Sequence, residues 1–371
     1  MRELIKLKRN YLLFLFPLSF ILILLARKSS FFAEHVYALR IYRWFSQLVS
    51  IITGLVPISL AEILIIILPF FLIILLIKFI SRLIKDKQNR KINAAKGLIN
   101  IICALSVALF SFTMLGGLNY YRYPFSYYSN LNIEKSTVEE LYGLTKQLAE
   151  QANELRALVP KVDDNGIFDL SMSYFKLAKE ANKAMMSLAE EYPVFSGRYG
   201  RSKPVLLSPL MSYTEITGIF VPFTMEANAN VHISDYAIPY TMLHEMAHQR
   251  GFMREDEANY IAYIAGMSSD NIELMYSSTM LALISAGNAL YNHDTKMYFD
   301  IRAMYSDGVV KDIRANSEYW VKYEDTVVST ISNKLNDTYL KVNAQADGVN
   351  SYGRMVDLLL AKYRAMLQEE R

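Results

Sequence analysis

The chain has 371 residues, of which 53% are hydrophobic, and a single cysteine. This composition is too apolar for one ordinary soluble domain and predicts membrane spans joined to a globular domain. The lone cysteine excludes a disulfide framework and a cysteine-ligated metal site. The net charge of +3 is unevenly divided: residues 1–100 carry 15 Lys and Arg against 4 Asp and Glu, and the rest carry 24 against 32. The acidic remainder argues against nucleic acid as a partner.

The first 118 residues predict a membrane domain with three transmembrane helices, at about 11–26, 58–80 and 97–118. A basic leader precedes the first helix and no small-residue cleavage site follows it, so we expect an uncleaved anchor. Residues 31–55 mix aromatic, apolar and basic side chains, which predicts a helix lying at the membrane interface. The lipid bilayer is therefore an expected partner.

The loop between the second and third predicted spans is strongly basic. It contains Arg82, Lys85, Lys87, Arg90, Lys91 and Lys96. By the positive-inside rule this loop and the basic N-terminus are expected in the cytoplasm. Three spans then place residues 119–371 outside it. We expect a multi-pass protein of the cell membrane with an extracytoplasmic C-terminal domain.

Most of that second domain, residues 119–371, is expected to be helical. Between residues 136 and 192 apolar side chains recur every three or four positions among charged ones, and Pro160–Gly166 is expected to divide this stretch into two helices. Residues 272–291 also predict a helix. Its Glu, Ser and Asn side chains indicate burial within the domain instead of a fourth span. The expected fold class is mostly α.

Residues 203–231 lack the helical periodicity of the preceding segment and predict the strands of a small sheet. Pro204–Ser208 and Thr217–Thr224 have the composition of short strands. Gly218–Thr224 is expected at the edge of the sheet, where an extended peptide could add itself by main-chain pairing. Glu226 and Asn228 come next and are typical of a turn.

The stretch Pro239–Tyr260 carries the clearest chemistry. His244-Glu245-Met246-Ala247-His248 is an H-E-x-x-H pentad. On a helix the two histidines are i and i+4, so both imidazoles point the same way, which is how such helices bind zinc. Glu245 is rotated about 100° from His244, so it flanks the metal and is placed to act as the general base toward a water there.

A catalytic zinc site needs a third protein ligand and an open fourth position. Gly251 is expected to end the first helix, and a second helix beginning near Met253 or Arg254 would bring Glu255 back toward the histidines. Glu257 is the alternative ligand. Acidic residues at 255–257 also suit a helix N-terminus that binds no metal, so a purely structural interpretation stays open. Candidate donors to an oxyanion are Tyr352 and Arg354.

The segment Arg254-Glu255-x-x-Ala258-Asn259 resembles the R-E-x-x-A-D segment of membrane-bound gluzincin peptidases of the HtpX and prenyl-protein-processing type. That resemblance implies that Glu255 is the third zinc ligand and that Asn259 orients a ligand histidine. The chain departs from the pattern in two ways. Asn replaces Asp, which weakens the polarisation of the histidine, and the gap between pentad and Glu is far shorter.

The run HEMAHQRGFMREDEAN more closely resembles the bacterial membrane family known as domain of unknown function 3810. The similarity extends through three further segments: Val56-Pro57-Ile58-Ser59-Leu60-Ala61-Glu62, Gly117-Leu118-Asn119-Tyr120-Tyr121-Arg122 and Ser351-Tyr352-Gly353-Arg354. This resemblance implies a zincin-like site on an α+β domain and no established substrate.

These patterns predict a membrane-anchored zinc metalloendopeptidase that acts on a peptide or protein substrate, which could itself be membrane-associated. Two other classes remain. One is a non-catalytic membrane sensor or assembly protein that retains a zincin-like zinc site. The other is a metal-free structural membrane protein in which the pentad is accidental. Zinc content measured together with peptide turnover separates the three.

Overall fold

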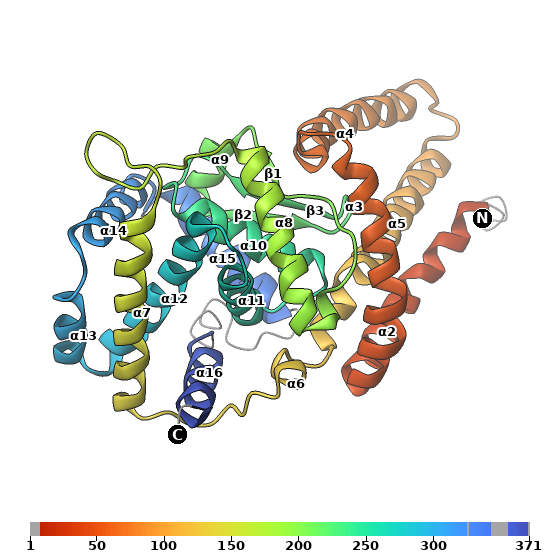
Figure 1. The fold of residues 1–371 in the computed structure, drawn as a ribbon. Helices are drawn as coiled ribbons and strands as arrows, with labels where there is room; N and C mark the ends of the chain where they lie inside the picture. Colours follow the sequence, from red (N-terminus) through yellow and green to blue (C-terminus); the bar gives the residue numbers. More distant parts are fainter. Residues whose placement is uncertain (1–7, 325, 343–354, 370–371) are drawn as a thin grey trace.

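In a computed structural model of the protein, which describes residues 8–324, 326–342 and 355–369, the chain is mostly helical around one three-stranded sheet. Figure 1 shows the N-terminal helices on one side of the molecule and the helices that surround the sheet on the other. The structure therefore confirms the predicted class: mostly α, three apolar N-terminal helices and a small sheet.

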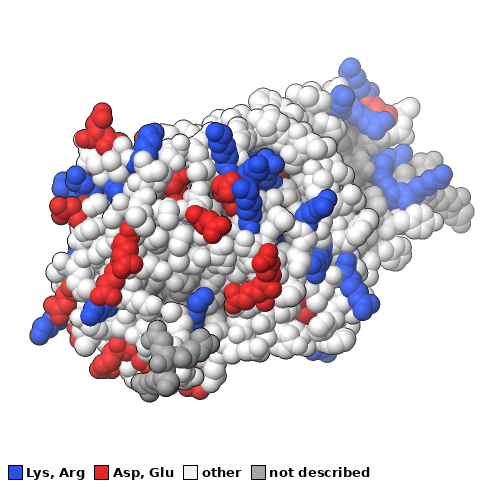
Figure 2. All heavy atoms as spheres, viewed as in Figure 1, with Lys and Arg blue, Asp and Glu red and all other residues white. Residues whose placement is uncertain are grey.

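Three helices in the described residues are long and apolar enough to cross a membrane. They are Lys8–Lys28, made of η1 (Lys8–Phe14) and α2 (Leu15–Lys28), then α4 (Leu60–Lys85) and α5 (Arg90–Leu115). The second and third continue past the predicted apolar stretches into the basic loop, because Lys and Arg are good helix formers. In Figure 2, Lys and Arg side chains lie together at the upper right, where Figure 1 places the connection between α4 and α5. These helices support association with a bilayer.

The segment between the first two spans, predicted as one helix over 31–55, is π-helical in η2 (Phe32–Tyr42) and α-helical in α3 (Arg43–Gly54). Its position at a membrane interface stays a prediction. The structure adds a second contact that hydropathy does not predict. The side chains of Glu34, Tyr37 and Tyr42 are buried against the rest of the protein.

The sheet consists of β1 (Lys203–Val205), β2 (Gly218–Val221) and β3 (Glu226–Asn230). β3 is central, parallel to β1 and antiparallel to β2, so β2 is an edge strand as predicted.

One expectation about this region is confirmed only in part, and another is wrong. The chain leaves β1 at Val205, and Ser208 already begins α9 (Ser208–Tyr213). Glu226 and Asn228 lie in the central strand, not in a turn. Every residue of β3 is buried between its two neighbours, and this tertiary setting outweighs the poor strand propensity of its Asn and Ala residues.

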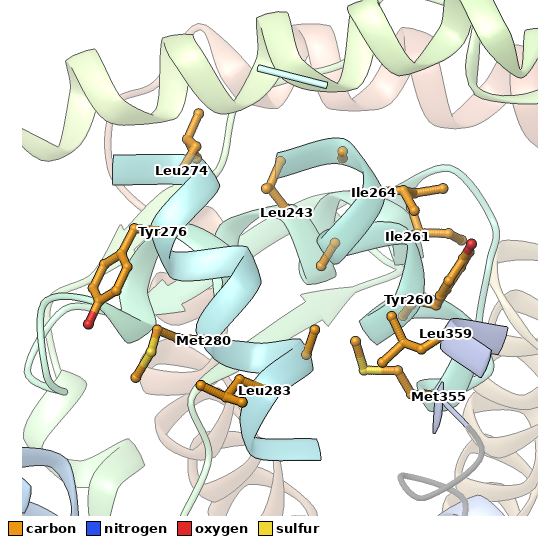
Figure 3. Close-up of a cluster of buried hydrophobic side chains, with 14 of the residues drawn as sticks. Leu243, Tyr260, Ile261, Ile264, Leu274, Tyr276, Met280, Leu283, Met355 and Leu359 are labelled. Carbon is orange, nitrogen blue, oxygen red and sulfur yellow. The ribbon is translucent and has the colours of Figure 1, made fainter. Parts of the chain in front are cut away.

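The helices of the domain pack around α12 (Ile272–His293), which is buried as predicted and passes through the core beside α7 (Val138–Leu158) and α11 (Glu255–Met267). Figure 3 shows Leu274, Met280 and Leu283 on α12 facing this core. The predicted break separates α7 from α8 (Tyr174–Glu191). The other elements are η3 (Gly117–Tyr121), α6 (Ser126–Ser129), η4 (Pro193–Phe195), α10 (Ala237–Gln249), α13 (Thr295–Arg302), α14 (Asp307–Trp320), α15 (Val327–Val342) and α16 (Met355–Glu369).

Candidate metal centre

The H-E-x-x-H pentad occupies the last two turns of α10. The helix ends at Gln249 with Arg250 as its C-cap, and Gly251 follows with φ of 88°. This left-handed conformation suits glycine, and it reverses the chain as the Gly251 N–H donates to the His248 carbonyl at 2.8 Å. After this turn α11 begins at Glu255, one or two residues later than predicted. The reversal brings the start of α11 next to the end of α10.

This reversal brings His244, His248 and Glu255 together, with one ligand atom of each within 4.8 Å of the others. The Oε2 atom of Glu255 lies 3.0 Å from Nε2 of His244 and 3.6 Å from Nε2 of His248. The two imidazole rings are nearly perpendicular, with centroids 4.6 Å apart. Two nitrogens and a carboxylate oxygen that converge in this way form a group that could hold a metal ion.

The other nitrogen of each imidazole is bonded to a carbonyl oxygen. His244 Nδ1 lies 2.8 Å from Oδ1 of Asn259, and His248 Nδ1 lies 2.6 Å from the Phe252 main-chain oxygen. Since these oxygens can only accept, each Nδ1 carries a proton, and Nε2 is the nitrogen of each imidazole that could bind a metal once it is deprotonated. Asn259 therefore fixes the tautomer of His244 although it is not an aspartate.

The group is electrostatically coupled. Burial by itself would lower the pKa of His248, but the Glu255 carboxylate outweighs it and raises that pKa to about 9. Burial would raise the pKa of Glu255, and the two imidazoles reverse this, so the pKa lies well below its usual value. The site therefore stabilises a buried carboxylate by adjacent positive charge, a role that a divalent cation would also fill.

Glu245 projects beside this group, toward β2. Burial raises the pKa of its carboxyl group to about 7, partly offset by the two histidines. The carboxylate accepts a hydrogen bond from the Phe220 N–H, while Oε2 is buried and has no hydrogen-bond partner among the described residues. A Cβ on Gly218 would lie 2.5 Å from Oε1 of Glu245 and 2.7 Å from Cγ2 of Thr241. Only glycine at 218 allows the strand to approach so closely.

The structure does not bring Glu257 to the centre. Its carboxylate accepts hydrogen bonds from the Phe125 N–H and from Arg254, so it fixes the start of α11 instead. Of the two candidate acids, only Glu255 faces the histidines. The candidate oxyanion donors, Tyr352 and Arg354, lie outside the described residues.

A buried ion pair behind the centre was not predicted. Arg122 binds both carboxylate oxygens of Glu34 on η2, at 2.6 and 2.9 Å. The same guanidinium donates to the Arg250 main-chain oxygen and lies 4.3 Å from the ring centroid of Phe252, whose carbonyl orients His248. A signal existed in the sequence, since Glu34 is acidic within an apolar segment, but its partner is 88 residues away.

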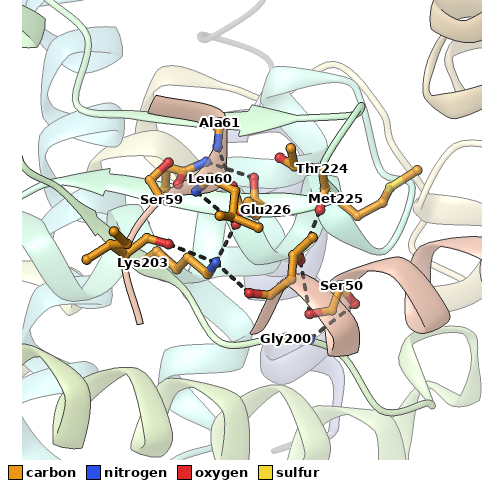
Figure 4. A network of polar contacts seen from close by, with 12 residues as sticks. Ser50, Ser59, Leu60, Ala61, Gly200, Lys203, Thr224, Met225 and Glu226 are labelled. Carbon is orange, nitrogen blue, oxygen red and sulfur yellow. Dashed lines mark hydrogen bonds and ion pairs between the residues drawn. The ribbon is translucent and has the colours of Figure 1, made fainter. Parts of the chain in front are cut away.

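A second unpredicted network joins the sheet to the start of α4 (Figure 4). Glu226 accepts hydrogen bonds from the main-chain N–H groups of Leu60 and Ala61 and forms a buried ion pair with Lys203. In the other direction, Glu62 accepts from the main-chain N–H groups of residues 206 and 207. Carboxylates at a helix N-terminus are favoured by its dipole. The start of α4 is therefore bonded both to β3, through Glu226, and to the residues that follow β1, through Glu62.

Comparison with known proteins found no match among curated proteins and none among solved structures. The similarity to gluzincin peptidases stays a prediction. A family model described as Protein of unknown function (DUF3810) matches residues 37–360, a range that includes every residue of the candidate metal centre. The chain therefore belongs to the DUF3810 family of proteins of unknown function.

Proposed function

We propose that the protein is a membrane-anchored, zinc-dependent metallopeptidase with a zincin-like domain. The observation that supports this most is the convergence of His244, His248 and Glu255 on one point. Three protein ligands of this kind leave a fourth position open, as hydrolytic zinc sites require. The buried Glu245 beside them has the chemistry of a general base.

In the proposed reaction His244, His248 and Glu255 would hold zinc, which when bound supplies a Lewis acid for water activation and carbonyl polarisation. Glu245 takes the proton of the attacking water on Oε2, which is buried and has no other partner among the described residues. It then returns the proton to the leaving amine. A pKa raised to about 7 suits both steps, because a group that titrates near the working pH accepts and donates readily.

The free edge of β2 supports a peptide as substrate. The Thr217 carbonyl accepts from the Asn230 N–H, so it points toward β3. Because main-chain groups alternate along an antiparallel strand, those of Gly218 and Phe220 point away from β3, and the Phe220 N–H indeed reaches Glu245. An extended peptide paired with this edge would lie against the general base.

Replacing Gly218 by alanine is expected to lower hydrolysis about 100-fold without loss of zinc, because a misplacement of the base by an ångström costs about that much. The added methyl group would collide with both Glu245 and Thr241. A suitable control is Gly287→Ala in α12, where a Cβ meets its nearest atom at an ordinary 3.5 Å. Equal turnover by the two variants would contradict this account of Gly218.

Zinc content tests the proposal directly. After metal-replete purification, elemental analysis is expected to find about one zinc per chain, as one three-ligand site requires, and His244→Ala is expected to lose it. His293→Ala is the matched control, because His293 is exposed at the end of α12. If wild type contains no stoichiometric zinc, the metal-free structural alternative is favoured. Stoichiometric zinc without turnover of any peptide library favours the sensor.

We also propose that residues 119–371 face outward from the cell membrane, with the N-terminus in the cytoplasm. The support is the charge of the α4–α5 connection, where Arg82, Lys85 and Lys87 flank the ends of two apolar helices. Only one candidate span, α5, lies between this loop and residues 119–371, so a membrane crossed by α5 would have the metal centre on the opposite side from the basic loop.

A further inference from the structure

Helix α3 is amphipathic, but its polar face is turned toward the protein and its apolar face outward, the reverse of a helix on a soluble protein. Its polar residues face the protein: Ser50 accepts from the Gly200 N–H, and the Thr53 hydroxyl donates to the Thr224 carbonyl. Its apolar side chains face outward and are exposed: Trp44, Leu48, Ile51, Ile52 and, just after the helix, Leu55. Water disfavours such a surface, whereas the edge of a bilayer favours it.

The turn between β2 and β3, residues 222–225, lies where the membrane elements meet the domain. α3 contacts it through Thr53, whose hydroxyl binds the Thr224 carbonyl at 3.0 Å. α4 begins beside it, with the Ala61 N–H 2.8 Å from Glu226. α5 ends beside it, since a Cβ on Gly116 would lie 3.4 Å from Cγ of Pro222. Because the start of α4, the end of α5 and the outward apolar face of α3 all lie beside this turn, we infer that residues 222–225 lie at the membrane surface.

From this turn β2 leads directly to the metal centre. The strand ends at Val221, next to the turn, and begins at Gly218, which abuts Glu245. Its four residues cover about 13 Å at the usual rise of a strand. Within the described residues β2 pairs with β3 alone, and along its other edge the Phe220 N–H is bonded to Glu245, so this edge runs from the membrane surface to the general base.

We propose that this edge receives the membrane-proximal segment of a membrane-anchored protein, a substrate class that rests on the peptidase function proposed above. The segment leaves the bilayer beside residues 222–225, pairs with β2 and reaches Glu245 after about four to eight residues. A substrate held in the same bilayer is presented at a high effective concentration, which a free peptide lacks. Cleavage sites are therefore set by their distance from the membrane.

The location of β2 is tested without any activity. In a Cys103→Ser background, a fluorophore is attached at Phe223→Cys, at Ile219→Cys or at the control Phe299→Cys, and the protein is placed in phosphatidylcholine vesicles containing nitroxide-labelled lipid. All three native side chains are exposed, and α13, which carries the control, lies far from the spans (Figure 1). Quenching is expected to be strongest at position 223, weaker at 219 and absent at 299. Equal quenching at 223 and 299 overturns the inference.

Substrate presentation is tested with Glu245→Gln protein and a synthetic single-span peptide whose polar tail carries one photoreactive residue. Cross-linking to β2 is expected to peak when that residue is about four to eight positions from the span, and the tail without its span is expected to react at least about tenfold less. A flat profile, or equal reaction of the free tail, overturns the inference. Cross-linking with the expected profile but no cleavage by wild type would refute the peptidase function and leave the docking of the segment supported.

Discussion

Replacing Glu245 by glutamine is expected to leave zinc bound and to lower peptide hydrolysis by a factor of about 10² to 10⁴, the usual contribution of a general base. Glutamine keeps the size of the side chain and an oxygen that can accept from the Phe220 N–H. It loses the ability to take a proton at Oε2. Turnover of a peptide library and zinc content, measured on the same preparation, check both parts of this expectation.

Two further glutamates serve as matched controls. Glu255→Gln is expected to lose zinc, because its carboxylate faces both imidazoles. Glu257→Gln is expected to keep zinc and activity, because an amide oxygen can still accept from the Phe125 N–H. If Glu245→Gln hydrolyses peptides as fast as wild type, Glu245 is not the base. If Glu257→Gln, and not Glu255→Gln, loses zinc, the third ligand is wrongly assigned.

Replacing Glu34 by glutamine is expected to lower the free energy of unfolding by about 3–5 kcal/mol, the usual cost of leaving one member of a buried ion pair without its partner. The side chains of Glu34 and Arg122 are 0% and 3% exposed, so water cannot compensate the guanidinium. Zinc affinity is expected to fall as well, because Arg122 holds the turn whose Phe252 carbonyl orients His248. Thermal unfolding in detergent and competition with a chelator measure the two effects.

Two controls test whether the effect of Glu34→Gln comes from the buried ion pair: a variant at an exposed ion pair, and a double variant that replaces both buried charges with apolar side chains. Glu318→Gln removes an exposed partner of Arg314 and is expected to cost no more than about 1 kcal/mol. Combining Glu34→Leu with Arg122→Met removes both charges and is expected to recover much of the stability but not the zinc affinity, since the Arg250 carbonyl loses its donor. A Glu34→Gln variant as stable as Glu318→Gln would show that the pair contributes little.

The local parts of the architecture were predictable. The three apolar helices follow from hydropathy, because a bilayer requires about 20 apolar residues in succession. The shared direction of His244 and His248 follows from the helical repeat. Gly251 marks the end of α10 because a helix often terminates in a left-handed residue. Each of these signals lies within a few residues of the feature that it specifies.

Other features depend on contacts between distant segments. The choice of Glu255 over Glu257 requires the angle between α10 and α11, which no spacing encodes. Glu226 and Asn228 are by themselves typical of a turn, but they lie in a strand because the burial of β3 comes from its neighbours and not from its own Glu, Ala and Asn residues. Glu34 meets Arg122, and Glu226 meets the start of α4, across 88 and 166 residues respectively. Helical and hydropathic patterns are short-range, whereas the burial that pairs these charges and opens the edge of β2 exists only once the whole chain has packed.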